Sequence, residues 1–416
     1  MAKYTYPNIP DTLIALAPSP DLKLCICIPC YQEEDIGSTI SSLMNCVAIQ
    51  GDVELIILIN DSEEDNDQTK QQNLISYETC VSLRYSCAEN GLSLIPILVD
   101  EIIVKKAGVG YARRLAMDEA ARRFNVINSS RGIIACLDAD TTVSENYLME
   151  IVRFFEENQN LSACSIAFEH DLRSPDEKIN SAICDYESHL RYFINMQRLI
   201  GLPFAYQTVG SAMAVTSRAY QKLGGMNSRK AGEDFYFLHK FIKNGLVGDL
   251  NSACVYPSAR VSDRVPFGTG KAVGDILSSR GSYETYNSQS FEDIHKLIVS
   301  LPLIFENDQG CFHILAQLSE PLTTYLKKEN FQEKIAEIRS NTSNYRSFRK
   351  RFFHWYDAFR LMKCLHFLRD MAYANIEVSI AIELLFSKLD LVISSDKYKN
   401  LHTLRAYDKD KIFKVT

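Results

Sequence analysis

Four short apolar runs alternate with helix-forming segments in the first third of this chain, and this alternation constrains its fold more than any other feature. Each run has the length and composition of a buried strand. The runs are Leu24–Pro29, Val53–Ile59, Leu92–Val104 and Ile133–Leu137. Helical spacing follows them at Ile36–Val47, Gln68–Asn90, Tyr111–Phe124 and Tyr147–Asn158. Strands that alternate with helices predict an α/β fold in which helices flank a mostly parallel sheet.

Polar or glycine-containing segments follow all four runs. In open α/β sheets, ligands bind outside the carboxyl ends of the strands. We therefore expect one crevice to receive all four segments. They are Pro29–Glu33, Asn60-Asp61, Lys105–Gly110 and Asp138–Asp140.

The fourth segment holds two carboxylates, Asp138 and Asp140, whose spacing puts them on one side of an extended chain. Two adjacent carboxylates repel each other unless a cation or a proton relieves them. Mg²⁺ suits such a pair, since it commonly takes one or two carboxylates together with substrate phosphates. The alternative interpretation is an acidic turn before a helix that Thr141, Thr142 or Ser144 caps.

Composition narrows the class of protein. The 416 residues carry a net charge of −7, which argues against a nucleic-acid-binding protein. The twelve cysteines lack metal-binding spacing and fit a reducing compartment. The sequence has neither the apolar core of a signal peptide nor a run long enough to cross a membrane. We expect a cytoplasmic protein with two domains, residues 1–274 and a mostly helical region at 275–416.

A second acidic pair, Glu233-Asp234, lies between a glycine turn and a helix. The simple interpretation is that both carboxylates favour the positive end of the helix dipole. The other interpretation is a general base, which requires a carboxylate at the edge of a cleft. The local sequence favours neither interpretation.

Two glycine-containing segments resemble nucleotide-binding motifs only in part. Gly108-Val109-Gly110 would open a dinucleotide fingerprint, but Arg113 stands where that motif needs a small residue. The segment 268–271 (GTGK) lacks the first glycine of a P-loop, and Ala272 replaces its Ser or Thr. We reject both motifs.

Basic residues surround the first of these glycine segments. Lys105, Lys106 and Arg113 lie at a strand end and in the first turn of a helix, where they are able to meet an anionic ligand. We expect Arg122 and Arg123, further along, to form a solvated helix face.

The C-terminal region is predicted to be helical and amphipathic, because aromatic and aliphatic residues recur at helical spacing between Tyr345 and Leu365. Basic residues lie among them, at 349–351, 360 and 363. We favour the interpretation that the aromatic face of this helix packs in a core and that its basic face is exposed to solvent. The alternative is a helix that lies on a membrane surface.

Taken in order, these segments resemble family 2 glycosyltransferases, which have the GT-A fold. The resemblance covers Leu24 to about Gly270, and each motif is specific only in combination with the others. The matching segments are Pro29-Cys30-Tyr31-Gln32-Glu33-Glu34, Asn60-Asp61-Ser62, Gly108 with Ala112-Arg113-Arg114, Asp138-Ala139-Asp140, Gly210–Arg218 with Gly224-Gly225, and Glu233-Asp234. The sequence departs from the family where it lacks a Gly after Asn60-Asp61 and has Arg114 in place of Asn.

The resemblance implies a role for each site residue. The nucleotide pocket would be lined by Pro29, Tyr31, Glu33, Asn60, Asp61 and Arg113. Asp138 and Asp140 would hold the ribose and a Mg²⁺ or Mn²⁺ ion on the diphosphate, and Asp234 would be the catalytic base. Glu233 would bond to the acceptor. The loop where the family often has a His ligand contains none, so Asp263 would replace it, and Arg264 or Lys271 would contact the diphosphate.

The resemblance thus predicts a metal-dependent, inverting glycosyltransferase with a nucleotide-sugar donor, a UDP-sugar being favoured. The acceptor would be a glycan, a lipid-linked sugar or a small molecule, and the enzyme would contact the inner membrane face peripherally if at all. Two alternatives stay open. One is a retaining transferase on the same fold, and the other is a non-catalytic nucleotide-sugar-binding protein on a degenerate scaffold.

Overall fold

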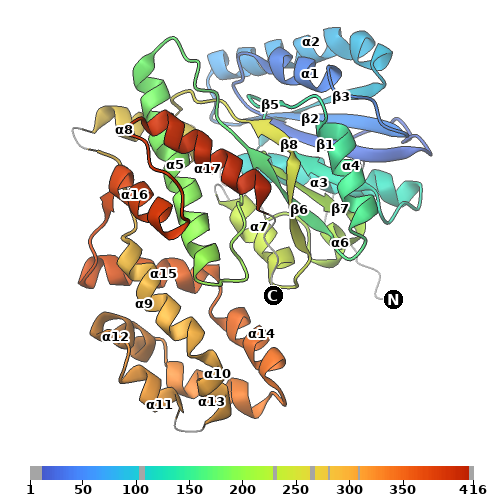
Figure 1. Cartoon of the computed structure of the whole chain (residues 1–416). Helices are drawn as coiled ribbons and strands as arrows, with labels where there is room; N and C mark the ends of the chain where they lie inside the picture. The colour runs from blue at the N-terminus through green and yellow to red at the C-terminus, as the bar shows by residue number, and fades with distance from the viewer. Residues whose placement is uncertain are drawn as a thin grey trace. The chain divides into compact units, whose positions relative to one another are not determined.

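The computed structural model describes residues 12–102, 108–227, 232–262, 268–279, 282–307 and 310–411. Two compact units are formed from interleaved parts of the chain (Figure 1). The first contains the residues through Asn180, Gln207–Gly274 and a short segment at 408–411, and the second contains Ser181–Tyr206 and Asp275–Tyr407. The separate domain at 1–274 stays a prediction. Within the described ranges, no helix has both the length and the apolar character needed to cross a membrane.

The first unit is built on an eight-stranded sheet with the order β3-β2-β1-β4-β7-β6-β8-β5. Its strands are β1 (Leu22–Cys30), β2 (Asp52–Ser62), β3 (Leu92–Ile102), β4 (Ile133–Cys136), β5 (Thr142–Val143), β6 (Ala163–Phe168), β7 (Met213–Thr216) and β8 (Val247–Tyr256). The β3-β2-β1-β4 half is parallel throughout, and β6 and β8 are also parallel to each other. Only β7 and β5 run against their neighbours, so the predicted mostly parallel sheet is confirmed.

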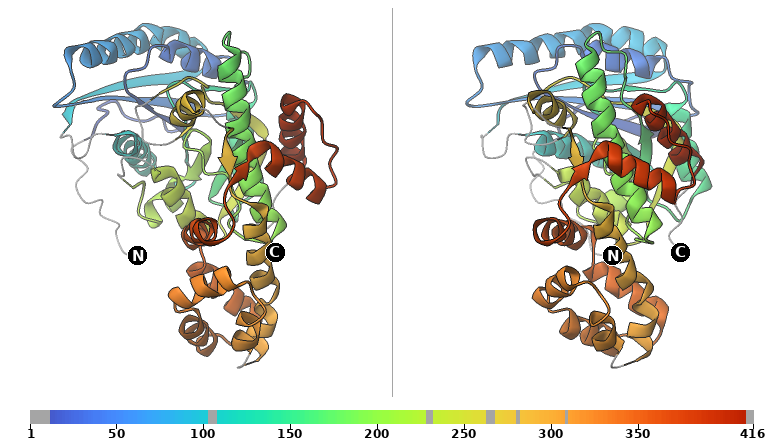
Figure 2. Two further views of the ribbon diagram at one scale, coloured as in Figure 1. Left: turned by 90° about the vertical axis from the view of Figure 1, so that its left-hand side faces the viewer. Right: turned by 60° about the vertical axis from the view of Figure 1, so that its left-hand side comes forward.

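Helices cover both faces of the parallel half. In Figures 1 and 2, α1 (Ile36–Met44) and α2 (Asp67–Glu89) lie on one face and α3 (Val109–Val126) lies on the other. The remaining helices that begin in this unit are α4 (Tyr147–Glu157), α5 (Glu177–Leu199), α6 (Ser217–Lys222), α7 (Glu233–Ile242) and α8 (Thr269–Ser278). With both faces covered, β1 is buried from Leu24 to Cys30, which explains its continuous apolar sequence.

The four strands of the parallel half bring their carboxyl ends to one edge. The pairing of β1 with β2 continues to Cys30 and Ile59, and β1 pairs with β4 up to Cys27 and Cys136. The loop after β1 then enters α1, where the Asp35 carboxylate caps the helix by accepting a hydrogen bond from the Ser38 N–H at 3.1 Å. This edge carries the candidate site.

One prediction about α3 is wrong. Arg123 is not solvated but only 1% exposed, and its guanidinium forms an ion pair with Glu54 of β2 and donates to the Leu16 carbonyl at 2.7 Å. Arg122 is one-quarter exposed and pairs with the buried Glu119. A buried guanidinium is tolerated here because a buried carboxylate and a carbonyl satisfy it.

The second unit is helical, as predicted for the C-terminal region. Besides the C-terminal part of α5, it contains a two-stranded antiparallel sheet and nine helices in its described part. The strands are β9 (Glu284–Thr285) and β10 (Ile376–Glu377). The helices are α9 (Ser288–Val299), α10 (Leu301–Glu306), α11 (Gly310–Leu315), α12 (Glu320–Lys328), α13 (Phe331–Ser340), α14 (Tyr345–Trp355), α15 (Ala358–Met371), α16 (Val378–Lys388) and α17 (Lys397–Asp410).

Candidate functional site

A buried arginine joins the two acidic pairs. Arg113, in the first turns of α3, is 3% exposed, and its guanidinium lies 2.5 Å from a carboxylate oxygen of Asp138 and also contacts Glu233. Burial opposes the charge of Arg113, but the two carboxylates outweigh it and raise the guanidinium pKa above its usual range. Gly210 leaves room for this group, because a Cβ there would lie 3.0 Å from both terminal nitrogens.

Arg113 therefore brings together segments that lie far apart in the sequence. Asp138 follows β4, while Glu233 begins α7, whose N-cap residue Gly232 has the left-handed φ of +70°. Glu233 is itself 3% exposed. Its predicted contact with an acceptor stays a prediction, and its carboxylate contacts Arg113.

Asp234 lies next to this cluster and is half-buried. Burial raises the pKa of its carboxyl group to about 6, and the charge of Glu233 adds to the rise. Arg113 and a hydrogen bond of 2.7 Å from the Phe235 N–H oppose that rise. A carboxylate whose pKa lies near neutral pH suits a general base.

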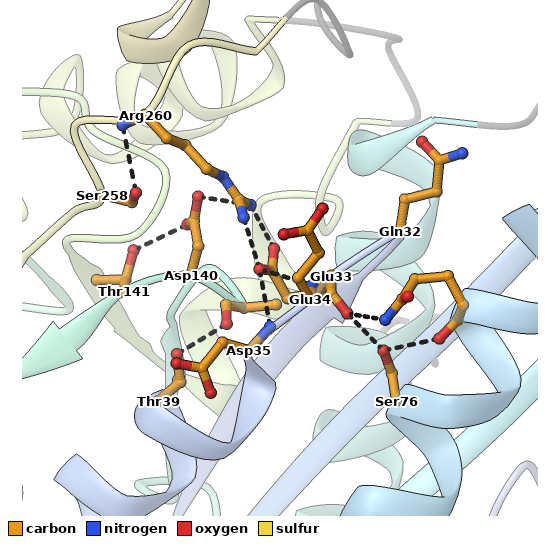
Figure 3. A network of polar contacts seen from close by, with 12 residues as sticks. Gln32, Glu33, Glu34, Asp35, Thr39, Ser76, Asp140, Thr141, Ser258 and Arg260 are labelled. Atoms are coloured by element: carbon orange, nitrogen blue, oxygen red, sulfur yellow. Dashed lines mark hydrogen bonds and ion pairs between the residues drawn. The ribbon is translucent and has the colours of Figure 1, made fainter. Parts of the chain in front are cut away.

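A second arginine, which the sequence analysis missed, joins two further predicted residues. Figure 3 shows Arg260, in the loop after β8, with its guanidinium against Glu33 and Asp140. It donates to Glu33 with both terminal nitrogens, one of them at 2.7 Å, and lies 3.0 Å from Asp140. Glu33 is only 3% exposed, and its carboxylate also accepts a hydrogen bond of 3.1 Å from the Glu34 N–H.

Gly270, from the segment that partly resembles a P-loop, has a packing role instead, and so does Gly274. A Cβ at Gly270 would lie 2.6 Å from the Cβ of Ser262 and 2.9 Å from its backbone nitrogen. At Gly274, one turn later in α8, a Cβ would lie 3.2 Å from a methyl group of Val261. The two glycines let the segment that follows Arg260 approach the helix.

The predicted nucleotide-pocket residues lie at the ends of β1 and β2. Pro29 is the penultimate residue of β1, and the Tyr31 hydroxyl donates to Asp65 at 2.9 Å. Asn60 and Asp61 are each 4% exposed within the last residues of β2.

A residue of α2, also missed from the sequence, ties these two strand ends together. The fully buried Asn73 donates to the Asn60 carbonyl at 3.0 Å and accepts from the Gln32 N–H at 2.8 Å. Gln32 has a left-handed φ of 49°, a conformation that costs energy for a side chain other than Gly. The hydrogen bonds of Asn73 therefore fix the loop that carries Tyr31 and Glu33.

Of the remaining predicted residues, the structure describes only Lys271. Lys271 lies in the first turn of α8. Asp263 and Arg264 lie outside the described residues, as do Lys105 and Lys106.

The acidic pair fits a hard divalent cation in its donor type. The Asp138 and Asp140 side chains are 38% and 29% exposed, although each contacts an arginine. Among the residues that the structure describes, no group of three or more His, Cys, Asp or Glu side chains forms a complete metal cluster. Two carboxylates suffice for Mg²⁺ when diphosphate oxygens complete its shell.

The charge of the crevice supports the same interpretation. Among the residues of this site that the structure describes, two guanidinium groups face five carboxyl groups. The guanidinium groups are those of Arg113 and Arg260, and the carboxyl groups are those of Glu33, Asp138, Asp140, Glu233 and Asp234. This excess of negative charge would repel a diphosphate. A divalent cation bound to the Asp138–Asp140 pair would reduce that repulsion.

Comparison with known proteins identifies the segment that carries most of these residues. Residues 133–292 match the model of glycosyl transferase family group 2. The matched segment contains Asp138, Asp140, Glu233, Asp234 and Arg260, while the β1 and β2 strand ends and Arg113 lie before it. No curated protein matches the chain.

Solved structures with overall similarity include S. aureus TarS 1–349. The complex of that protein with UDP-GlcNAc is 14% identical, with 94% of this chain and 89% of that chain covered and a TM-score of 0.39. Its structure without a named ligand is 13% identical and its complex with UDP 12% identical; both cover 78% of this chain and 93% of that chain at a TM-score of 0.40.

Proposed function

We propose that this chain transfers a sugar from a nucleotide-diphosphate donor to an acceptor hydroxyl with inversion of the anomeric centre. The match of residues 133–292 to the model of glycosyl transferase family group 2 supports this proposal. The observation that carries the proposal is the buried Arg113 guanidinium, which contacts both Asp138 and Glu233. This contact joins Asp138, which is assigned to the donor, to the start of α7, where Asp234, the proposed base, directly follows Glu233.

The donor is proposed to bind at the ends of β1, β2 and β4. Pro29, Tyr31, Glu33, Asn60 and Asp61 would surround the nucleotide, for which we favour uridine. Asp138 and Asp140 would hold Mg²⁺ or Mn²⁺, which supplies positive charge to the diphosphate as it leaves. We assign a direct diphosphate contact to Arg260, because its guanidinium already lies at Asp140.

Asp234 is proposed to accept the proton of the acceptor hydroxyl. With a pKa of about 6, it is mostly ionised at neutral pH and still basic enough to assist deprotonation. The Arg113–Glu233 contact would fix the start of α7 and so orient Asp234 towards the reacting hydroxyl. The acceptor would be a glycan, a lipid-linked sugar or a small molecule. The many cysteines favour a reducing compartment, and we propose the cytoplasm.

The test is the substitution Asp234→Asn, assayed with UDP-, GDP- and dTDP-sugars, Mn²⁺ and a panel of acceptors. We expect transfer to fall by about 10²–10⁴-fold, which is the usual contribution of a general base. Donor binding should survive, so the donor should still raise the melting temperature of the variant. Asp171→Asn, an exposed aspartate paired with Arg173, is the matched control and should transfer normally.

Two results would contradict the proposal at different points. Wild-type transfer by Asp234→Asn would remove the base assignment but keep the enzyme class. A product whose anomeric configuration by NMR equals that of the donor would show retention instead of inversion.

A further inference from the structure

One region of the second unit differs in charge from the rest of the chain. Residues 339–369 contain eight Lys or Arg and a single acidic residue, Asp357, a net charge of +7. The whole chain has a net charge of −7, so the other residues together carry −14. Some of these cations have partners within the fold: Arg360 pairs with Glu329, and the Arg349 guanidinium lies over the Phe353 ring. Clustered cations repel one another, so the exposed ones are the part of this cluster that is available to an anionic partner.

The cations are concentrated on α14, at the edge of the second unit in Figure 1. Arg346, Lys350 and His354 follow one another at intervals of four residues and are exposed, and Arg351 is exposed beside them. On the opposite side the helix buries an aromatic face of Phe348, Phe352 and Trp355. The helix contains no acidic residue.

Exposed aliphatic side chains lie on the neighbouring helices. Val299, at the end of α9, and Leu303, in α10, are each 58% exposed. The helix α10 packs against α14 through the Phe305 ring, whose centroid is 5.4 Å from that of Phe348 and 6.1 Å from that of Tyr345. The second unit thus has both a basic helix face and exposed aliphatic residues, the two features that surfaces binding at a bilayer interface combine.

We propose that the exposed face of α14 binds an anionic lipid bilayer. The Arg346, Lys350 and Arg351 side chains lie against the phosphates of the headgroups, and Val299 and Leu303 enter the boundary between headgroups and acyl chains. Charge complementarity selects the anionic surface. The aliphatic pair distinguishes a bilayer from a soluble polyanion, which offers no apolar phase. This proposal does not depend on the transferase activity.

The test is sedimentation of the full chain with vesicles of phosphatidylcholine, with and without 30% phosphatidylglycerol. We expect binding only to the anionic vesicles, and release as NaCl is raised from about 0.1 M to 0.5 M. Replacing Arg346, Lys350 and Arg351 by Glu should weaken binding by at least about a hundredfold, because each cation near an anionic surface contributes about a fivefold gain. The double substitution Val299→Ser and Leu303→Ser should weaken it about tenfold.

A matched control has the same change of charge elsewhere. Arg84, Lys178 and Lys222 are exposed residues of the first unit, and their triple replacement by Glu should leave vesicle binding within about twofold. If the Glu variant at α14 does not fold, Gln at the same three positions tests the proposal without introducing new negative charge.

Three results would overturn the proposal. These are equal binding to neutral vesicles, an equal loss in the first-unit control, and binding to inorganic polyphosphate without binding to anionic vesicles. The last would identify the partner of α14 as a soluble polyanion.

Discussion

Asp234 shows how its surroundings change the acidity of one carboxyl group. Glu233 and Asp234 are adjacent in the first turn of α7, but Glu233 contacts Arg113 directly. Asp234 is half-buried beside the negative charge of Glu233, and its pKa rises to about 6. Under the proposed function, Glu233 would hold the start of α7 in place and Asp234 would exchange a proton with the acceptor.

This pKa predicts the pH dependence of transfer. A base must be ionised to act, so kcat/KM should fall tenfold per pH unit below about pH 6 and level off above it. Because Glu233 contributes to the raised pKa, Glu233→Gln should move this acid limb to lower pH. Initial rates between pH 4.5 and 8.5 measure both effects. An acid limb that stays in place or moves upward in the variant would show that Glu233 has no such influence.

The raised pKa of Asp234 also makes the folding stability depend on pH. The folded-state pKa of Asp234 exceeds the ordinary value of 3.8, so ionisation costs folding free energy as the pH rises from about 4 through 6. That cost amounts to at most about 3 kcal/mol above pH 6. Because of this cost, the ionised Asp234 carboxylate lowers the free energy of unfolding relative to an apolar side chain at the same position.

Some site residues were predictable from the sequence, and others were not. Asp138 and Asp140 follow directly on an apolar strand, and Asp234 lies at a glycine-to-helix boundary, so local pattern and order along the chain indicated them. Arg260 and Asn73 act through partners that lie 227 and 41 residues away. Nothing in their local sequence distinguishes them from ordinary polar residues.

At the scale of elements, the start of α8 positions the segment that carries Arg260. The Ser262 N–H donates to the Gly270 carbonyl at 3.2 Å, and Thr269 contacts the buried His170 at 3.1 Å. The helix is thus tied both to this segment and to the loop after β6. Its two glycines differ in how closely the segment approaches them.

This difference predicts unequal effects of two similar substitutions. Gly270→Ala would put a methyl group 2.9 Å from the Ser262 backbone nitrogen, so the segment must shift and Arg260 with it. We expect the donor KM to rise about tenfold, as for the loss of one good charged contact. In Gly274→Ala the methyl group meets only the end of Val261, and the gain in helix propensity should offset that contact. Steady-state kinetics with varied donor measures the contrast, and equal KM values in the two variants would contradict it.

The strands were predictable to different degrees. β1, β2 and β4 are uninterrupted apolar runs buried on both faces, which the sequence analysis recognised. β8 was missed, because Asp249, Asn251 and Ser252 interrupt its apolar pattern. β5 has only two residues and exists through its pairing with β8 at Thr142–Tyr256 and Val143–Val255. Two residues are too few to form a hydrophobic pattern that would predict a strand from the sequence.

At the scale of the whole molecule, each compact unit is assembled from separate parts of the sequence. Ser181–Tyr206 belongs to the second unit although it lies between two parts of the first. Within the first unit, the Asn251 side chain donates to the Asp408 carbonyl at 2.9 Å, and Lys409 lies 2.5 Å from a carboxylate oxygen of Glu169. Cutting the chain at any single point would therefore separate segments that belong to the same compact unit.

A fragment of residues 1–274 should therefore be unstable. It lacks the segment at 408–411, and it exposes buried α5 residues such as Ile183 and Tyr192, which belong to the second unit. We expect the fragment to aggregate, or to melt well below residues 1–411, in size-exclusion chromatography and thermal denaturation. A monomeric fragment with the melting temperature of the longer chain would show that residues 1–274 fold independently.

Because residues 408–411 belong to the first unit, the ribosome completes the sequence of that unit late in synthesis. After Gly274, the ribosome adds 134 further residues, of which Asp408 is the last. At synthesis rates of 5–20 residues per second this delay lasts about 7 to 27 s, far longer than a sheet of this size needs to collapse. During that interval Glu169 and Asn251 have not met their partners, and the nascent sheet is open to chaperones and proteases in a way that the finished enzyme is not.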